Sequence, residues 1–173
     1  LPGKKLLLKD DDVDATKRKI VLLAKDPSIV SGTPLGVADP TCVGSGGGGG
    51  TLELKSAASG QDVLIALPCG NWSVIGDPAD EKGYQYKDKT LVSGPCKIVT
   101  VKNGKLVKAV CSAKNLASPI NYDLTTGEGD VQGFLTTGAA TYCTEFSSVT
   151  RIIKEDDNKA FKAKDSLAPA TCP

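Results

Sequence analysis

The stretch CKIVTVKNGKLVKAVC, Cys96–Cys111, decides the fold class of this chain. Two runs rich in valine flank Asn103 and Gly104, a dipeptide typical of a two-residue type I′ hairpin turn, because both central residues need a positive φ. The turn sets a register that places Cys96 opposite Cys111. We therefore predict an antiparallel hairpin bridged by a disulfide across a hydrogen-bonded pair, with Cα atoms ~5.5 Å apart.

The predicted register also divides this hairpin into two faces. Lys102 faces Lys105 next to the turn, and alternation then assigns every second residue to the same side. One side carries Lys97 and Lys108, and we expect it to be solvated. The side expected to enter the core carries Cys96, Ile98, Thr100, Val107, Ala109 and Cys111.

Short runs of the same kind fill the rest of the chain, separated by Gly, Pro, Asn and Asp. Only Asp11–Lys19 has a pattern compatible with a helical turn. This organisation is typical of all-β proteins, so we predict a β-sandwich of jelly-roll or immunoglobulin-like type. The candidate strands are Lys4–Leu8, Arg18–Ala24, Thr51–Lys55, Val63–Leu67, Trp72–Ile75, Tyr84–Lys87, Cys96–Val101, Lys105–Cys111, Ile120–Leu124, Val131–Thr136, Thr141–Phe146, Thr150–Lys154 and Ala160–Lys164.

The six cysteines predict a covalent framework, because none of them lies in a Cys-x-x-Cys pair. An even number at wide spacing is typical of disulfides formed in an oxidising compartment. We therefore expect three disulfides and a secreted protein, extracellular or on the cell surface. Beyond Cys96–Cys111, the other four cysteines allow three sets of pairs, and sequence proximity favours Cys42–Cys69 with Cys143–Cys172.

A run of glycines divides the chain unevenly. Residues 44–50 are expected to form a Gly-rich loop between residues 1–43, an N-terminal strand arm with the first strands, and residues 51–173, the main body. Leu52 and Leu54 resume a strand pattern directly after the glycines. We therefore favour a single domain over the alternative, in which an N-terminal arm is separate from the main body.

The composition argues against catalysis and against strongly charged partners. Histidine is absent, which excludes Ser-His-Asp and Cys-His machinery and His-ligated metal sites. No pattern pairs the carboxylates Glu53, Asp123 and Glu145, and Asp10–Asp14 lacks the spacing of a calcium loop. We expect no enzyme, catalytic residue, cofactor or metal. The net charge is +1, from 21 basic and 20 acidic residues, so we expect neither nucleic acid binding nor membrane insertion.

The segment Lys4, Lys5, Leu6, Leu7 and Leu8 is the first candidate functional element. Three consecutive leucines do not alternate with polar residues, so both faces of this strand favour burial. A terminal strand of this kind can complete the sheet of a neighbouring subunit by β-strand exchange, and repeated head-to-tail donation builds an open fibre. The alternative is an ordinary intramolecular strand.

Four segments also carry a resemblance: KKLLLKD, TKRKIVLLAKD, GPCKIVTVKNGKLVKAVC and FKAKDSLAPATC. They resemble segments of uncharacterised secreted bacterial β-sandwich proteins, a group that includes subunits of extracellular filaments. The resemblance implies a β-sandwich without known catalytic residues. It also implies a structural subunit of a filament or surface assembly, whose partner is a second copy of the chain.

A monomeric carbohydrate-binding or adhesin module is the alternative function. Tyr84 and Tyr86 share one face of a predicted strand, and with Trp72 they could stack on sugar rings. Asn71 begins an Asn-x-Ser triplet and is a candidate glycosylation site. In this interpretation glycans are the partner.

Overall fold

The structure, a computed structural model, describes residues 1–11, 14–77, 80–114, 120–124, 127–147, 152–156 and 159–172. Within these residues it contains twelve strands and two 3₁₀ helices, and no α-helix. The strands are β1 (Gly3–Lys9), β2 (Lys19–Ala24), β3 (Gly50–Ser56), β4 (Asp62–Leu67), β5 (Trp72–Asp77), β6 (Asp80–Lys87), β7 (Cys96–Lys102), β8 (Leu106–Ser112), β9 (Val131–Thr137), β10 (Ala140–Phe146), β11 (Ile152–Asp156) and β12 (Ala160–Lys164). The 3₁₀ helices are η1 (Ala15–Lys17) and η2 (Cys69–Asn71).

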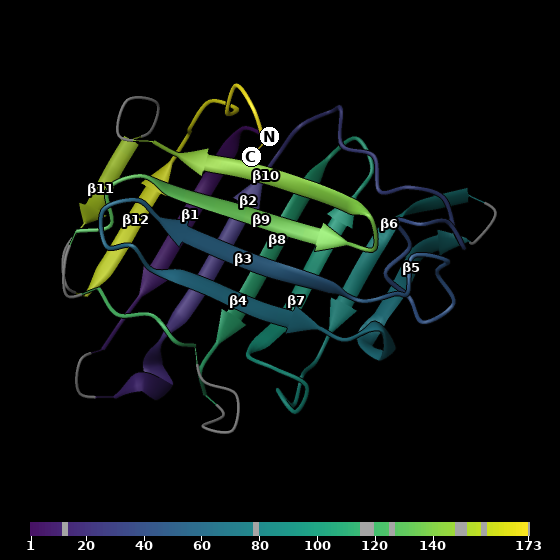
Figure 1. The fold of residues 1–173 in the computed structure, drawn as a ribbon, viewed down its shortest axis with the longest axis horizontal. Coiled ribbons are helices and arrows are strands. Elements are labelled where there is room, and N and C mark those ends of the chain that lie inside the picture. The colour runs from purple at the N-terminus through teal and green to yellow at the C-terminus, as the bar shows by residue number, and fades with distance from the viewer. Residues whose placement is uncertain are drawn as a thin grey trace.

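The described strands form two sheets in which all neighbours are antiparallel. The large sheet has eight strands in the order β11-β12-β1-β2-β8-β7-β6-β5, and the small sheet has four in the order β10-β9-β3-β4. In Figure 1 the small sheet lies in front of the large sheet, and its strands run across those behind. The all-β, sandwich-like prediction is confirmed; its jelly-roll or immunoglobulin-like type stays a prediction.

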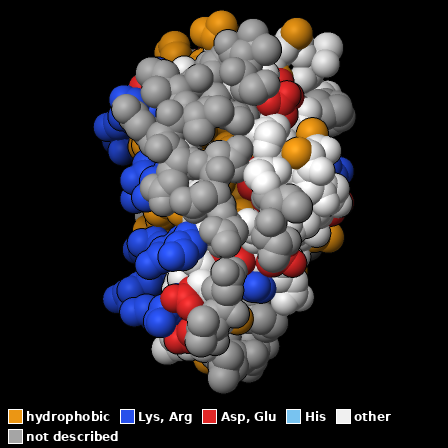
Figure 2. All heavy atoms as spheres, turned by 90° about the vertical axis from the view of Figure 1, so that its left-hand side faces the viewer, with side chains coloured by type: hydrophobic (Ala, Val, Ile, Leu, Met, Phe, Trp, Pro, Cys, Tyr) orange, Lys and Arg blue, Asp and Glu red, His pale blue; other side chains and the backbone are white. Residues whose placement is uncertain are grey.

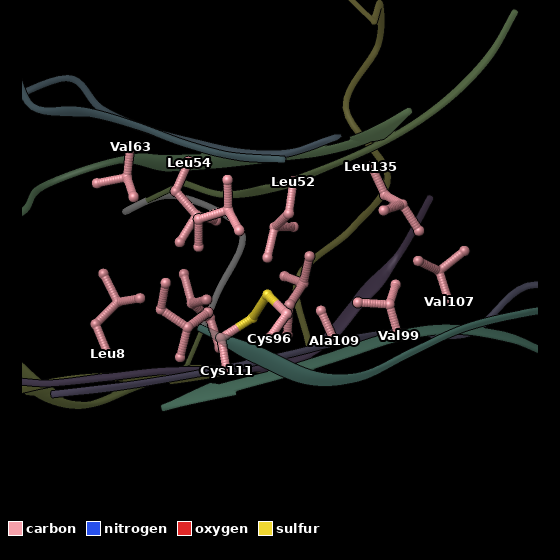
Figure 3. Close-up of a cluster of buried hydrophobic side chains, with 14 of the residues drawn as sticks. Leu8, Leu52, Leu54, Val63, Cys96, Val99, Val107, Ala109, Cys111 and Leu135 are labelled. Carbon is pink, nitrogen blue, oxygen red and sulfur yellow. A yellow bond between two sulfur atoms is a disulfide. The ribbon is translucent and has the colours of Figure 1, made fainter. Parts of the chain in front are cut away.

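The hydrophobic core fills the space between the two sheets. Leu52 and Leu135 of the small sheet face Val99 of the large sheet, and all three are fully buried (Figure 3). The disulfide between Cys96 and Cys111 lies in the same layer (Figure 3). Each large aliphatic side chain buried in this way stabilises the fold by roughly 1.5–3 kcal/mol, so a chain poor in aromatic residues still builds its core.

The hairpin exists, but its predicted register is wrong. Lys102 faces Leu106 and not Lys105, and the connection is a three-residue loop in which Gly104 alone has a positive φ, of 60°. Contacts outside the hairpin hold this loop, because the Asn103 side chain accepts a hydrogen bond from Ser31 N at 2.6 Å. A type I′ turn is therefore replaced by the common three-residue alternative.

An irregularity at Lys97 returns the hairpin to its predicted end point. The ladder shifts between Cys96 and Ile98, so that Cys96 still faces Cys111. Their Cα atoms are 3.8 Å apart, closer than a hydrogen-bonded pair. The shift also turns Ile98 out of the core, so the predicted core face is wrong for the first strand of the hairpin. Cys96 enters the core as predicted, but Val99 and Val101 take the places predicted for Ile98 and Thr100.

The predicted strand Ile120–Leu124 is wrong in a different way. Its alternation is real, since Ile120, Tyr122 and Leu124 are buried while Asn121 and Asp123 are exposed. However, side chains take up its backbone hydrogen bonds in place of a neighbouring strand. Asp10 accepts from Leu124 N at 3.1 Å, and Gln61 accepts from Asp123 N at 2.8 Å. A period of two fixes which side chains are buried, and not whether a strand partner is present.

All three predicted disulfides are confirmed. Cys42 is bonded to Cys69, Cys96 to Cys111 and Cys143 to Cys172, and no cysteine is free. The predicted helical turn within Asp11–Lys19 is also present, as η1.

The Gly-rich stretch packs against the loop that precedes it. A Cβ atom at Gly46 would lie 2.1 Å from the carbonyl oxygen of Val37, and one at Gly44 would lie 2.1 Å from that of Asp39. Glycine is therefore required here by a close backbone approach. The Cys42–Cys69 bond links this region to η2, beside β4.

Candidate binding site: the lysine face of the large sheet

Positive charge is concentrated on five neighbouring strands of the large sheet. Strands β12, β1, β2, β8 and β7 contain no acidic residue at all. Their lysines gather in a column along one side of the molecule, the outer side of the large sheet (Figure 2). We call this outer surface the lysine face; its lysines are Lys4, Lys5, Lys9, Lys19, Lys97, Lys102, Lys108, Lys162 and Lys164.

The ladder places like charges directly opposite each other. Lys9 of β1 faces Lys19 of β2, and Lys5 of β1 faces Lys164 of β12. Such pairs destabilise a sheet, because opposite positions bring the side chains close together. Asp165 relieves the second pair, since its carboxylate lies 3.6 Å from Lys164 Nζ. Within the described residues, neither Lys9 nor Lys19 has an acidic group within ion-pair distance, so no ion pair relieves the repulsion of the first pair.

The lysine face is hollowed around the Lys9–Lys19 pair. The hollow has a volume of about 760 Å³, and aliphatic side chains, among them Leu7 and Val110, form part of its floor. Asp14 is the one acidic residue of its described lining. The lysines that line this hollow are Lys9, Lys17, Lys19, Lys89, Lys97 and Lys114.

A buried tyrosine fixes the backbone beneath the charged pair. The Tyr122 hydroxyl accepts a hydrogen bond from Lys9 N at 3.0 Å and lies 2.6 Å from Lys9 O and 2.8 Å from Lys19 O. It therefore bridges the two strands where their lysines repel. Burial raises the pKa of Tyr122 above its ordinary value, so the hydroxyl keeps the proton that it donates.

A buried ion pair anchors the same end of the two strands. Arg18 Nε donates to Asp10 Oδ1 at 2.7 Å, and the Asp10 side chain is fully buried. Asp10 also accepts from Leu124 N, and the Arg18 guanidinium lies 5.9 Å from the centre of the Tyr122 ring. Both charges are thus compensated. Arg18 therefore adds no free positive charge to the hollow.

Lys17 contributes less uncompensated positive charge than the other lysines of the hollow, because two carboxylates lie beside it. Its Nζ lies 3.3 Å from Asp11 and 3.6 Å from Asp14. The hydrogen bond and charge of Asp11, followed by the charge of Asp14, raise the pKa of Lys17. In turn, hydrogen bonds from Thr16, with the nearby Lys17, lower the pKa of Asp14. Within Asp10–Asp14, the carboxylates of Asp10, Asp11 and Asp14 therefore each lie beside a cation of the protein itself.

The segment Lys4–Leu8 lies in the centre of the lysine face. It forms most of β1, which pairs with β12 on one side and β2 on the other within the same chain. Leu6 and Leu8 are buried in the core, while Leu7 is half-buried in the floor of the hollow. Both faces are thus used, as three consecutive leucines predict. Both ladders of β1 are also complete in the single chain, so donation to a neighbour requires them to open.

The aromatic residues expected to stack on sugars do not form a surface. Tyr84 and Tyr86 are 0% exposed and Trp72 is 6% exposed, so this prediction is wrong for all three. The alternation of β6 turns both tyrosines inward, where Trp72 and Tyr86 pack edge to face with centroids 5.6 Å apart. Asn71 Nδ2, the atom to which a glycan would be attached, donates to the Tyr86 hydroxyl at 3.2 Å.

Two other kinds of site are not found in the described part of the chain. None of its side-chain groups brings together three or more potential metal ligands. It also contains no helix with the length and apolar character needed to cross a bilayer.

The lysine face is not predictable from the sequence alone, although its lysines are visible there. The net charge of +1 averages over both sheets and conceals their segregation. Each of these strands carries at least one lysine beside its buried residues, but only the strand order brings the five together. The strand predicted at Ile120–Leu124 gives no reason to expect the Tyr122 hydroxyl to bridge the backbones of β1 and β2.

Comparison with known proteins finds no matching family model, no matching characterised protein and no matching solved structure.

Proposed function

We propose that this chain is an adhesive module that works outside the cell and holds an anionic partner on its lysine face. The observation that carries this proposal is the Lys9–Lys19 pair: two like charges face each other across a ladder, without an acidic partner among the described residues. Such a pair costs stability, and an anion bound between the two lysines removes that cost. The hollow around the pair offers room for the anion.

The extracellular part of the proposal rests on the covalent framework. All six cysteines are paired, in a small protein built from two sheets. This combination fits an oxidising environment, where disulfides persist. A rigid two-layered scaffold with one charged face suits attachment, because the binding groups stand on paired strands and not on loops.

Charge reversal tests the proposal directly. We expect the chain to bind an immobilised polyanion, such as polyacrylate, with an affinity that falls as salt is added, and to ignore a neutral polymer. The double variant Lys9→Glu/Lys19→Glu should lose this binding. The matched control Lys25→Glu/Lys105→Glu makes the same change of net charge at exposed lysines outside the hollow. Equal loss in both double variants would contradict the proposal.

The second candidate function is a structural subunit of an extracellular filament, assembled head-to-tail by exchange of β1. The observation that favours it is the position of β1: the N-terminal strand of this chain sits inside the sheet, and Leu6 and Leu8 enter the core from it. Removal of β1 would open a groove between β12 and β2, which the β1 of a second copy could fill.

A reversible crosslink tests this candidate. Leu7 faces Val21 across the β1–β2 ladder. The variant Leu7→Cys/Val21→Cys can therefore be oxidised to tie β1 to its own chain. If exchange builds filaments, electron microscopy should show them for the wild-type chain and for the reduced variant, and not for the variant oxidised before assembly. Filaments that form equally well after oxidation, or a wild-type chain that forms none, would reject the candidate.

A further inference from the structure

We infer that the anionic partner of the lysine face is an acidic polysaccharide, an extended chain of sugars bearing carboxylate or sulfate groups. The inference rests on the proposed function and names the chemical class of its ligand. It follows from the shape of the face, from the kind of cation that it presents, and from the position of the exposed apolar side chains.

The shape of the face suits a polymer better than a single small anion. The hollow around Lys9 and Lys19 is adjoined, across Leu7, by a second depression of about 310 Å³ lined by Lys5, Lys162 and Lys164, among others. Leu7 of β1 lines both. Adjacent strands lie about 4.8 Å apart, so the lysines of β12, β1 and β2 are spread over two such steps across the sheet. A flexible chain with repeated charges can contact both depressions at once.

The lining of the hollow contains both kinds of group that an acidic sugar needs, aliphatic side chains for its C–H faces and ammonium groups for its anionic substituents. Leu7 and Val110 are half-buried between lysines. Aliphatic side chains in this position can pack against the C–H faces of sugar rings, while the ammonium groups above them reach the ring substituents. Ser112 and Thr16 add hydroxyl groups to the lining.

The same face is a poor match for nucleic acid. Binding of single strands relies on aromatic rings on which bases stack, and phosphate recognition often uses the planar fork of arginine. The five strands of the lysine face contain no arginine, and Phe161, their one aromatic residue, is fully buried. Only lysine is offered, as a point charge on a flexible stem.

The face is also a poor match for a lipid surface. A protein that lies on a bilayer inserts exposed apolar side chains next to its cations. Here the apolar side chains among the lysines, such as Leu7 and Val110, are half-buried. The described large apolar side chains that are exposed lie elsewhere, on loops and on β4 of the small sheet: Val30, Leu35, Val37, Val43, Leu64, Val92 and Leu167.

The test compares four kinds of ligand under one set of conditions. The full chain is titrated with polygalacturonate and heparin as acidic polysaccharides, dextran as the neutral polymer, phosphatidylglycerol vesicles, and single- and double-stranded DNA. We expect the acidic polysaccharides to bind at least about tenfold more tightly than vesicles or DNA at physiological salt, and dextran not to bind. Lys9→Glu/Lys19→Glu should weaken polysaccharide binding about tenfold or more, and Lys25→Glu/Lys105→Glu should leave it within about twofold. Thermal melting of both variants checks that each is folded.

The outcomes separate this inference from the proposed function. If vesicles or DNA bind as tightly as the acidic polysaccharides, or more tightly, and Lys9→Glu/Lys19→Glu abolishes that binding, the polysaccharide inference fails and the anionic lysine face survives. If no polyanion binds the folded chain, both fail. If acidic polysaccharides bind and the two double variants lose binding equally, the ligand class is right but the site is wrong, which also overturns the inference.

Discussion

The outer faces of the two sheets differ in how they treat their charges. On the small sheet two of the acidic side chains have partners: Glu53 lies 3.1 Å from Lys55, and Glu145 accepts a hydrogen bond from Gln132 at 3.2 Å. On the lysine face, charges of one sign face each other. The small sheet carries charges of both signs, whereas lysine is the only charged residue type on the five strands of the lysine face. In a chain with a net charge of +1, this difference supports the proposed role of the lysine face.

The two faces also differ in what covers them. The C-terminal tail is bonded to β10 of the small sheet through Cys143–Cys172. Ser166 of the same tail donates to Glu145 O, and Phe134, on the outer side of β9, is only 6% exposed. Nothing in the described chain covers the hollow of the lysine face in this manner. The predictions below break or sharpen this contrast, from the largest expected effect to the smallest.

The largest effect is expected from Asp10→Ala. The change leaves the Arg18 guanidinium without its buried partner and removes the acceptor of Leu124 N. We expect the free energy of unfolding to fall by about 3–5 kcal/mol, measured by urea denaturation. Asp11→Ala, which removes a more exposed partner of Lys17, should cost less than about 1 kcal/mol. Equal losses in the two variants would show that the buried pair does not anchor the lysine face.

The double variant Cys143→Ser/Cys172→Ser acts on the small sheet alone. Loss of this disulfide should lower the free energy of unfolding by about 2–4 kcal/mol, because the unfolded chain gains freedom. Binding of polyanions should not change, since the lysine face lies on the other sheet. Titration of the folded variant with polygalacturonate measures this, and a marked loss of affinity would place part of the site on the tail.

The variant Tyr122→Phe tests the support of the lysine face at a single atom, the Tyr122 hydroxyl oxygen. Without the hydroxyl, Lys9 N loses its acceptor, and the backbone of Lys9 and Lys19 is no longer bridged. We expect a loss of about 1–2 kcal/mol in the free energy of unfolding. A positioning role also predicts weaker polyanion binding under conditions where the variant remains folded. Unchanged affinity in the folded variant would reduce Tyr122 to a structural role.

The single variant Lys9→Glu should raise stability while it weakens binding. The introduced carboxylate would face Lys19, so a like-charge pair becomes an attractive one and the free energy of unfolding should rise by about 0.2–1 kcal/mol. Removal of a ligand-binding cation should lower polyanion affinity in the same molecule. Opposite changes in the two measurements are the signature of a pair retained for function; a loss of stability would contradict it.

The smallest effect concerns pH. The pKa of Asp14 is lowered, chiefly by hydrogen bonds from Thr16, so its contribution to stability is present above its ordinary pKa and is lost as the pH falls through the lowered one. Protonation of Asp14 also removes one of the two carboxylates beside Lys17 and leaves Asp11. Binding of a sulfated polymer, which stays ionised, should therefore tighten slightly as the pH falls below about 3.8. The variant Asp14→Asn should not show this tightening; the same tightening in the variant would assign it to another group.

The sequence predicts the local structure of this chain better than its surfaces. The strand runs and the cysteine spacing are local signals, and they lead to nearly all the strands and to all three disulfides. The register of the hairpin at Asn103 is not predictable from the turn alone, because Ser31, remote in sequence, holds the Asn103 side chain. One shifted residue then turns Ile98 from the core to the lysine face.

The lysine face depends on strand order, which the sequence does not reveal. β2 pairs with β8, although the two strands lie far apart in the sequence, and β1 pairs with β12 from the opposite end of the chain. The β1–β12 ladder places Lys5 beside Lys164, whereas Lys9 lies beside Lys19 through the local β1–β2 ladder. For Trp72, Tyr84 and Tyr86 the residue types suggest a sugar platform, but the alternation within β5 and β6 decides that their rings point inward.

The most direct test of the lysine face is protection of individual lysines from acetylation. The chain is treated with a lysine-selective reagent at low conversion, with and without saturating polygalacturonate, and each lysine is quantified by mass spectrometry. We predict that Lys9, Lys19 and Lys97 become protected from acetylation. Lys55, which lies on the small sheet, and the control lysines Lys25 and Lys105 should react as before. Uniform protection of all lysines, or protection that is greatest at Lys55, would contradict the account.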